Sequence, residues 1–382
     1  MCGIVGYVGD RDCADVLVDA LSKLEYRGYD SAGIAVVEKG VIKVEKCKGR
    51  LANLVDKMAV DGKPQGHCGI GHTRWATHGE PSDINSHPHG NKRVSIVHNG
   101  IIENYKQIKD FLIEEGYSFV SETDTETVAK LLDYYYVDDP VDTIIKVLSE
   151  IKGSYALGIM FRDYPDTVFA VRKESPLIVG VGENENFLAS DVPAIIKYTR
   201  DYYLLEANEI AVVKKDSVQI YDMHKEPVHK EINTADWDVD AAEKGGYEHF
   251  MLKEIHEQPA AVRDTVSPRI INGMPDLSQD GVDMQKLKDY RQIFIVACGT
   301  AMHAGMVGKY VIEKLARKPV IVDIASEFRY RDPIITKDDL MIVISQSGET
   351  ADTMAVLRLA KEVGAATLAV VNVVGSSIAR EA

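Results

Sequence analysis

The sequence predicts two α/β domains of different architecture. Up to about residue 235, short turns join many of the extended segments, which favours antiparallel strands with helices on the outer faces. Beyond residue 246, short β-branched runs alternate with helices, a pattern typical of a doubly wound parallel sheet. A chain of 382 residues also exceeds what one hydrophobic core usually organises. We therefore expect a first domain over 1–240, a linker with an amphipathic helix over 241–286, and a second domain over 287–382.

The first domain is expected to mix strands and helices along its length. Apolar alternation and apolar runs predict strands, and apolar residues at helical spacing predict helices. The expected strands are 3–9, 33–38, 41–46, 66–71, 94–97, 155–161, 167–171, 210–213 and 218–221. The expected helices are 15–26, 104–115, 126–137 and 141–151.

The boundary between the domains is placed in an acidic stretch over 235–246 that ends in two glycines. A helix over 247–265 follows, and the expected strands of the second domain are 292–297, 320–324, 340–344 and 367–373. Two polar turns, 298–301 and 345–350, come directly after strands, and a helix over 351–362 follows the second turn. In a doubly wound sheet ligands bind at the carboxyl ends of the strands, so both turns are candidate ligand sites.

Composition narrows the class of protein. The formal net charge of −15 argues against nucleic acid or an anionic membrane as the main partner. No secretory segment and no run of about 18 apolar residues is present, so we expect neither export nor a membrane span. The cysteines are odd in number and lack metal-ligand spacing, which favours reduced thiols in the cytoplasm; they are Cys2, Cys13, Cys47, Cys68 and Cys298.

Cys2 is the strongest chemical signal in the chain. Removal of Met1 would leave a thiol and an α-amine on the same residue. A free thiol titrates near pH 8.5 and an α-amine near 7.7–8.0, so the amine can act as the base that takes the thiol proton. The alternative is a small apolar residue at the start of a buried strand.

Six histidines between His67 and His98 invite a metal hypothesis, but their spacings match no common zinc template and no carboxylate pattern accompanies them. No metal is therefore expected. Among them lies Arg74, whose planar guanidinium suits bidentate binding of a substrate carboxylate. The alternative for Arg74 is a surface packing pair with Trp75.

Asn99 and Gly100 follow the expected strand 94–97. A side-chain amide and a following glycine N–H could stabilise the oxyanion of an acyl-transfer intermediate, although Asn-Gly is also a common hairpin turn. Asp124 lies in a segment that reads as a helix start, where it could cap the helix or bind a substrate ammonium.

Taken together, Cys2, the 27–33 segment, the 74–79 segment, Asn99-Gly100 and Asp124 resemble the class II glutamine amidotransferases with an N-terminal nucleophile. The resemblance implies a four-layer αββα fold in which Cys2 attacks the glutamine amide. It also implies roles for six other residues. Arg74, Thr77 and Asp124 would bind glutamine, His78 would support the loop beside it, and Asn99 and Gly100 would form the oxyanion hole.

The turns at 298–300 and 345–350 are similar to those of the sugar isomerase domain that binds phosphosugars. The combination resembles amidotransferases that pass ammonia to fructose 6-phosphate and form glucosamine 6-phosphate, with no metal or organic cofactor and usually as homodimers through the isomerase region. Trp75 would gate the ammonia passage. The phosphosugar contacts implied are Thr300, Ser345, Gln346, Ser347 and Thr350.

Two departures from that family are visible. Ala301 stands where relatives can carry a serine, so one hydrogen bond to the phosphate would be missing or supplied elsewhere. The family continues through a second isomerase domain, so we expect an incomplete doubly wound sheet and a chain that at most hydrolyses glutamine. An ordinary helix cap remains the alternative for the 345–350 turn.

Two other functions remain open. An amidophosphoribosyltransferase would share Cys2 and Asn99-Gly100, but should carry an acidic pair beside a hydroxyl-rich loop, and none follows Gly246. A non-catalytic regulator would use the 345–350 turn to sense a phosphosugar, with an inert first domain.

Overall fold

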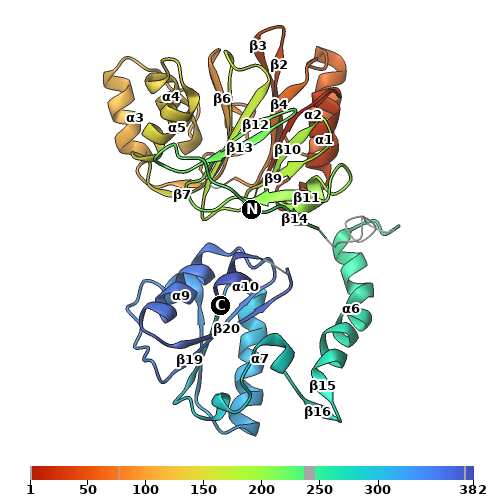
Figure 1. Cartoon of the computed structure of the whole chain (residues 1–382), viewed down its shortest axis with the longest axis vertical. Coiled ribbons are helices and arrows are strands. Elements are labelled where there is room, and N and C mark those ends of the chain that lie inside the picture. Colours follow the sequence, from red (N-terminus) through yellow and green to blue (C-terminus); the bar gives the residue numbers. More distant parts are fainter. Residues whose placement is uncertain (1, 77, 236–245, 374–375) are drawn as a thin grey trace. The chain divides into compact units, whose positions relative to one another are not determined.

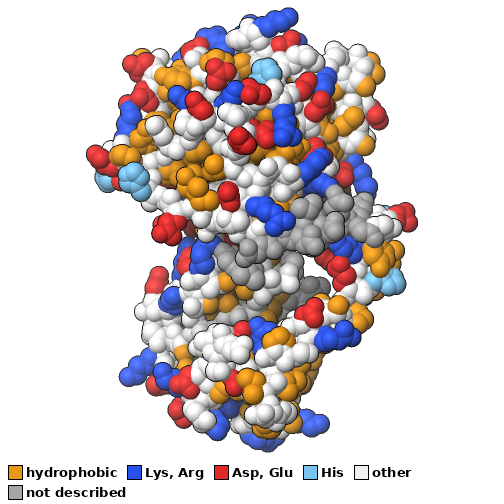
Figure 2. Space-filling view, turned by 45° about the vertical axis from the view of Figure 1, so that its right-hand side comes forward, with side chains coloured by type: hydrophobic (Ala, Val, Ile, Leu, Met, Phe, Trp, Pro, Cys, Tyr) orange, Lys and Arg blue, Asp and Glu red, His pale blue; other side chains and the backbone are white. Residues whose placement is uncertain are grey.

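The computed structural model describes residues 2–76, 78–235, 246–373 and 376–382. It divides into two compact units, Met1–Gly245 and Gly246–Ala382. The expected boundary at 240 lies outside the described residues. On the face drawn in Figure 2, acidic and basic side chains are interspersed over both units. Among the described residues, no helix has the length and apolar character needed to cross a bilayer.

The first unit contains two antiparallel sheets. The first sheet has the order β14-β11-β9-β10-β1-β4-β2-β3 and the second β13-β12-β8-β7-β6-β5. The strands of the first sheet are β1 (Gly3–Val8), β2 (Ser31–Glu38), β3 (Val41–Lys48), β4 (Cys68–Arg74), β9 (Ile178–Val181), β10 (Asn186–Ala189), β11 (Asp201–Leu204) and β14 (Asn233–Thr234). Those of the second are β5 (His89–Gly90), β6 (Val94–Ile102), β7 (Gly153–Phe161), β8 (Thr167–Lys173), β12 (Ile210–Lys214) and β13 (Val218–Tyr221).

Helices cover the outer faces of both sheets (Figure 1). Helices α1 (Cys13–Ser22) and α2 (Leu51–Asp61) share one apolar core with the first sheet. Helices α3 (Tyr105–Glu114), α4 (Asp124–Tyr135) and α5 (Pro140–Leu148) share another with the second sheet. A third core, which includes Ile4, Ile70 and Val97, lies between the sheets. These layers confirm the predicted αββα fold.

Local sequence explains how several helices begin. Asp12 accepts a hydrogen bond from the N–H of Ala14 at the start of α1. Asp139 accepts hydrogen bonds from two N–H groups at the start of α5, whose first residue is Pro140. Thr123 caps α4 by accepting from the N–H of Glu126. Helix α1 starts and ends earlier than the predicted 15–26, and α2 had not been predicted.

The second unit contains a four-stranded parallel sheet in the order β18-β17-β19-β20, as predicted for this half of the chain. Its elements are α6 (Phe250–Val266), β15 (Ile270–Ile271), β16 (Met274–Pro275), β17 (Ile293–Ala297), α7 (Gly299–Leu315), β18 (Val320–Ile324), α8 (Ala325–Phe328), β19 (Leu340–Ser345), α9 (Ala351–Glu362), β20 (Ala366–Val371) and α10 (Ser377–Glu381). Phe294, Val296, Met341 and Val343 of the central strands pack against α9. The fully buried Asp339 before β19 forms a bidentate pair with Arg291 before β17, which ties the two strand starts together.

Candidate active site

Cys2 lies directly before β1, and the strand register places it beside the end of β4. Gly3 of β1 pairs with Thr73 of β4, so Cys2 is next to Arg74 and Trp75. The backbone N–H of Trp75 donates to Cys2 Sγ at 3.2 Å, and the Trp75 carbonyl lies 3.5 Å from the same sulfur. Burial raises the pKa of the thiol, while the Trp75 N–H and the Arg74 charge oppose that rise. The thiol is therefore neutral near pH 7, and its reaction as a nucleophile requires a base.

Asn99 reaches Cys2 from the other sheet. It lies on β6, and its Nδ2 donates to the backbone carbonyl of Cys2 at 2.9 Å. The next residue, Gly100, has φ 126°, and a Cβ there would lie 2.0 Å from the carbonyl oxygen of Ser154 on β7. Only glycine fits this position. The Asn-Gly pair thus lies within a long strand rather than at the tip of a hairpin.

Arg74 uses only part of its hydrogen-bonding capacity. The side chain is 3% exposed, and its Nη2 donates to the backbone carbonyls of His78 and, at 3.1 Å, Gly79. The other terminal nitrogen, Nη1, is buried and has no hydrogen-bond partner among the described residues. Burial lowers the pKa of Arg74, and the carboxylates of Asp30 and Asp124 counter that effect. The unused Nη1 is therefore a donor suited to an anionic ligand group beside the thiol.

The segment after β4 is held by Asp30, whose Oδ2 accepts a hydrogen bond from the N–H of Ala76. The indole of Trp75 is 49% exposed and meets the Tyr29 ring edge-on at 5.4 Å. The ring of His78 contacts that of Tyr105. Thr77, a predicted glutamine contact, lies outside the described residues.

Asp124 is the first residue of α4 and is 5% exposed. Its Oδ2 accepts a hydrogen bond of 2.8 Å from the N–H of Ile102, at the end of the strand that carries Asn99. A carboxylate at a helix N-terminus is stabilised by the helix dipole. This bond fixes Asp124 relative to β6 and so relative to Asn99.

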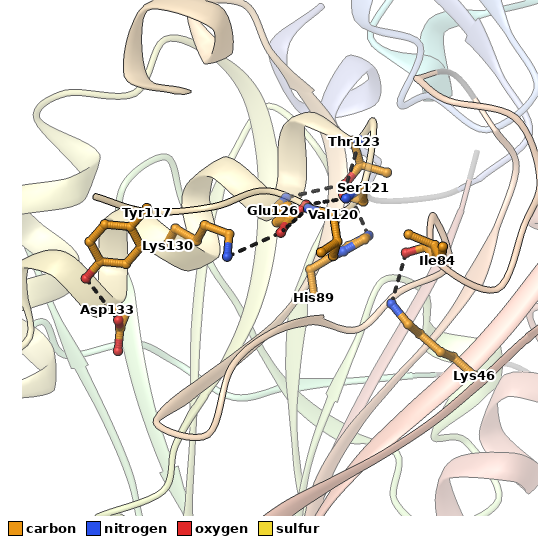
Figure 3. A network of polar contacts seen from close by, with 10 residues as sticks. All are labelled: Lys46, Ile84, His89, Tyr117, Val120, Ser121, Thr123, Glu126, Lys130 and Asp133. Atoms are coloured by element: carbon orange, nitrogen blue, oxygen red, sulfur yellow. Dashed lines mark hydrogen bonds and ion pairs between the residues drawn. The ribbon is translucent and has the colours of Figure 1, made fainter. Parts of the chain in front are cut away.

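A polar network holds the first turn of α4 (Figure 3). The Glu126 carboxylate accepts hydrogen bonds from the N–H groups of Val120 and Ser121, at 3.1 and 2.6 Å, and pairs with Lys130. Burial tends to raise the pKa of Glu126, but these hydrogen bonds outweigh it and lower the pKa. Thr123 also contacts His89 Nε2 at 3.1 Å. The turn that presents Asp124 is therefore fixed on several sides.

Four of the six histidines noted in the sequence are buried and contact one another: His72, His87, His89 and His98. His72 stacks on His87 at 4.1 Å, and burial lowers the pKa of all four rings. Within the described ranges, no group of three or more His, Cys, Asp or Glu residues could hold a metal ion. The cluster is thus a set of neutral rings packed inside the protein.

The predicted phosphosugar residues lie at one edge of the second unit's sheet. Parallel pairing of β17 with β19 sets Ala297 beside Ile344, so the turns that follow both strands are neighbours. Ser345 Oγ lies 3.0 Å from Thr350 Oγ1 and accepts from the N–H of Gly348. Thr300 and Gln346 are exposed, and Ser347 is half-buried. Hydroxyls and N–H groups before α9 form an arrangement suited to a phosphate.

Sequence reasoning assigned no role to His72, Asp30 or Lys46, all of which support the site. His72 Nε2 lies 3.0 Å from Asn99 Oδ1, and Lys46 Nζ donates to the carbonyls of Ile84, Ser86 and Pro88. Asp30 lies inside the 27–33 segment that carried the family resemblance, so the sequence contained a signal from which its role could have been predicted. The other two act through long-range contacts that no local pattern reveals.

Comparison with known proteins agrees with this division into two units. Residues 72–197 match the glutamine amidotransferase domain family, and residues 286–382 match the SIS domain family. The chain is 60% identical over 385 residues to the glutamine–fructose-6-phosphate aminotransferase (isomerising) of Clostridium acetobutylicum and 59% identical over 386 residues to that of Clostridium tetani. Each match covers 100% of this chain and 63% of the relative. The chain therefore spans slightly less than two thirds of the length of these relatives.

Among solved structures, the glutamine phosphoribosylpyrophosphate amidotransferase of Bacillus subtilis matches with a TM-score of 0.54 at 17% identity, over 97% of this chain and 81% of that one. At this identity the match shows a shared fold. The two family matches show that the chain joins a glutamine amidotransferase domain to an SIS domain, and over its whole length the chain is similar to the glutamine–fructose-6-phosphate aminotransferases named above.

Proposed function

We propose that this chain hydrolyses glutamine at Cys2 and that, in the whole protein, the ammonia is passed to fructose 6-phosphate to give glucosamine 6-phosphate. The observation that carries the proposal is the position of Cys2 between the Trp75 backbone and the Asn99 amide, with the free Nη1 of Arg74 beside it. The names of the two relatives reported above supply the acceptor sugar.

The proposed reaction begins once Met1 is removed. The α-amine of Cys2 takes the thiol proton, and the sulfur attacks the side-chain carbonyl carbon of glutamine, so that a C–S bond forms and the carbonyl π electrons move to oxygen. The Asn99 amide and the Gly100 N–H stabilise this oxyanion. When the intermediate collapses, the C–N bond breaks, the proton held by the amine passes to the leaving nitrogen, and ammonia departs. Water then cleaves the thioester to release glutamate and restore the thiol.

Glutamine would be held at its other end by two charges. The unused Nη1 of Arg74 would donate to the α-carboxylate, and the Asp124 carboxylate would accept from the α-ammonium. Thr77 and His78 complete the proposed glutamine contacts. Arg74 is also bonded to the carbonyls of His78 and Gly79, so this loop would hold the guanidinium in place for the carboxylate.

The second unit would bind the acceptor. Thr300, Ser345, Gln346, Ser347 and Thr350 are the proposed contacts to the sugar phosphate. Their hydroxyls and the neighbouring N–H groups lie at the carboxyl ends of β17 and β19. Trp75, exposed beside the thiol, is the proposed gate for the ammonia.

We further propose that the protein works in the cytoplasm as a homodimer paired through the isomerase region, with no metal, cofactor, nucleic acid or membrane partner. The net charge of −15 supports the absence of a polyanionic partner. Sedimentation equilibrium of the whole protein tests the dimer, and a monomer at micromolar concentration would contradict it.

The proposal is tested by glutamate release from the purified chain, with Cys2→Ala as the inactive variant and Cys298→Ala as a control for general thiol loss. We expect release by the parent and by Cys298→Ala only. Intact mass should show loss of one methionine and one adduct after treatment with a glutamine-analogue electrophile. A mature protein that lacks Met1 and yet releases no more glutamate than Cys2→Ala would overturn the proposal.

A further inference from the structure

We infer that His72 is a positioning residue for the oxyanion hole: it holds the Asn99 amide in the orientation that directs its N–H groups toward Cys2. The inference rests on the proposed glutamine hydrolysis and adds to it a residue outside the substrate contacts. It follows from the hydrogen bonds of the Asn99 side chain.

His72 and Asn99 belong to different sheets and meet in the buried layer between them. His72 is on β4 and is 1% exposed. Its Nε2 lies 3.0 Å from Asn99 Oδ1 and 3.1 Å from the backbone carbonyl oxygen of His98. Both neighbours are acceptors, so Nε2 carries the proton and donates to them.

This donor determines which way the Asn99 amide points. In the observed orientation Oδ1 accepts from His72, and Nδ2 donates to the carbonyl of Cys2 at 2.9 Å. Rotation by 180° would set Oδ1 against the Cys2 carbonyl and Nδ2 against the donor of His72, and both contacts would be lost. The second N–H of Nδ2 is then left for a ligand oxygen beside Cys2.

The surroundings of His72 keep it neutral and fixed in place. Burial lowers the pKa of His72 to about 3, so the ring carries one proton at neutral pH. Its Nδ1 is buried without a partner in the described part of the chain. The ring stacks on His87 with an interplanar angle of 14°. A rigid ring with a single used donor orients an amide more firmly than a flexible polar side chain could.

The test separates the donor from the bulk of the ring. His72→Phe keeps the ring and the stacking but removes the donor, and His72→Gln keeps a donor. We expect His72→Phe to lower kcat for glutamine hydrolysis by about 10- to 100-fold, below the roughly 10²- to 10³-fold cost of losing an oxyanion donor outright. KM should change less than about 3-fold, because Arg74 and Asp124 hold the substrate. His72→Gln should recover most of the lost kcat.

Two further readouts distinguish positioning from a general structural effect. Alkylation of Cys2 by iodoacetamide displaces iodide at a saturated carbon and forms no oxyanion, so its rate should stay within about 2-fold of the parent in His72→Phe. In an Asn99→Ala background, His72→Phe should have almost no further effect on kcat. The matched control is Ser95→Ala, which removes from the same strand as Asn99 a buried hydroxyl that has no hydrogen-bond partner among the described residues, and it should leave kcat unchanged.

The outcomes are distinguishable from failure of the proposed function. If the parent itself hydrolyses no glutamine, the proposed function fails. If the parent is active, the inference is overturned by an unchanged kcat in His72→Phe, by additive effects with Asn99→Ala, or by a parallel loss of iodoacetamide reactivity. Should His72→Phe not fold, His72→Leu supplies the donor-free variant, and a His72→Gln protein as slow as His72→Leu would equally overturn the inference.

Discussion

Arg74 illustrates at the residue scale how one side chain can support a site and still serve a ligand. One terminal nitrogen is bonded to loop carbonyls, and the other is buried without a partner among the described residues. A buried donor without an acceptor costs about 1–3 kcal/mol of folding free energy. Binding of a carboxylate would recover that cost, which is why an unpartnered polar group marks a site better than a satisfied one.

Asp124 offers a residue-scale prediction on substrate binding. Asp124→Asn keeps an oxygen that can accept from the N–H of Ile102 but loses the charge that would pair with the glutamine ammonium. A hydrogen bond to a charged group contributes about 1.5–3 kcal/mol, so KM for glutamine should rise by about 10- to 100-fold with a smaller change in kcat. Steady-state glutaminase kinetics measures both.

Asp133→Asn is the matched control on the same helix. Asp133 is also buried, but it lies near the other end of α4, where its carboxylate accepts a hydrogen bond from the Tyr117 hydroxyl (Figure 3). Its KM should equal that of the parent. Equal increases in KM for the two variants would show that Asp124 acts through the stability of α4 and not through the substrate.

At the scale of elements, Lys46 on β3 connects the first sheet to the segment that carries the histidines. Its Nζ donates to the carbonyls of Ile84, Ser86 and Pro88 at 3.1, 2.8 and 3.2 Å. These carbonyls flank His87, on which His72 stacks. The ammonium therefore fixes an irregular segment that has few backbone partners of its own.

Lys46→Met should destabilise the first unit, because the side-chain stem is preserved but three carbonyl groups lose their donor. We expect a loss of about 1–3 kcal/mol in the free energy of unfolding, measured by urea denaturation. Lys43→Met, on the same strand and largely exposed, should change it by less than about 0.5 kcal/mol. Similar losses in the two variants would contradict this role of Lys46.

The same lysine predicts a pH dependence at alkaline pH. Burial lowers the pKa of Lys46 to about 8, whereas in the unfolded chain it is near 10.4. Between these values the unfolded state binds more protons, so this group makes stability rise with pH over that window. The rise should be absent in Lys46→Met when urea midpoints are compared from pH 8 to 10, and an identical rise in both proteins would refute the assignment.

At the scale of the whole molecule, the two units differ in how they should respond to acid. The first unit buries four histidines whose pKa values are lowered by burial, and the second buries none among its described residues. Below about pH 6.5 these histidines bind protons in the unfolded chain but stay neutral in the folded protein. The free energy of unfolding therefore falls as pH falls. Each such histidine contributes at most about 1.4 kcal/mol per pH unit.

Hydrogen exchange from pH 7 to 5, corrected for intrinsic rates, should therefore show loss of protection in the first unit before the second. In His89→Phe the slope of unfolding free energy against pH should decrease by about one proton. Simultaneous loss of protection in both units would argue against this origin of acid sensitivity.

Prediction of elements from the sequence succeeded where the pattern is local. Strand β1 and helices α3, α4 and α9 follow apolar periodicity and were predicted within a few residues of their bounds. Helix α2 was missed because only Leu51, Leu54 and Met58 of its eleven residues are buried, which leaves a narrow apolar stripe. Strands β9, β10 and β11 have four residues each, too few for alternation to be recognised.

The sequence alone determined the elements with a clear apolar period, the division into a mixed and a parallel half, and the candidate catalytic and substrate-binding groups around Cys2, because periodicity and short motifs are local properties. Tertiary structure alone decided which groups meet. The pairing of β1 with β4 sets Cys2 beside Arg74, and the packing of two sheets brings Asn99 to Cys2 and His72 to Asn99. Such contacts depend on strand register and sheet packing, which join residues 27 to 97 positions apart and leave no trace in any short stretch of sequence.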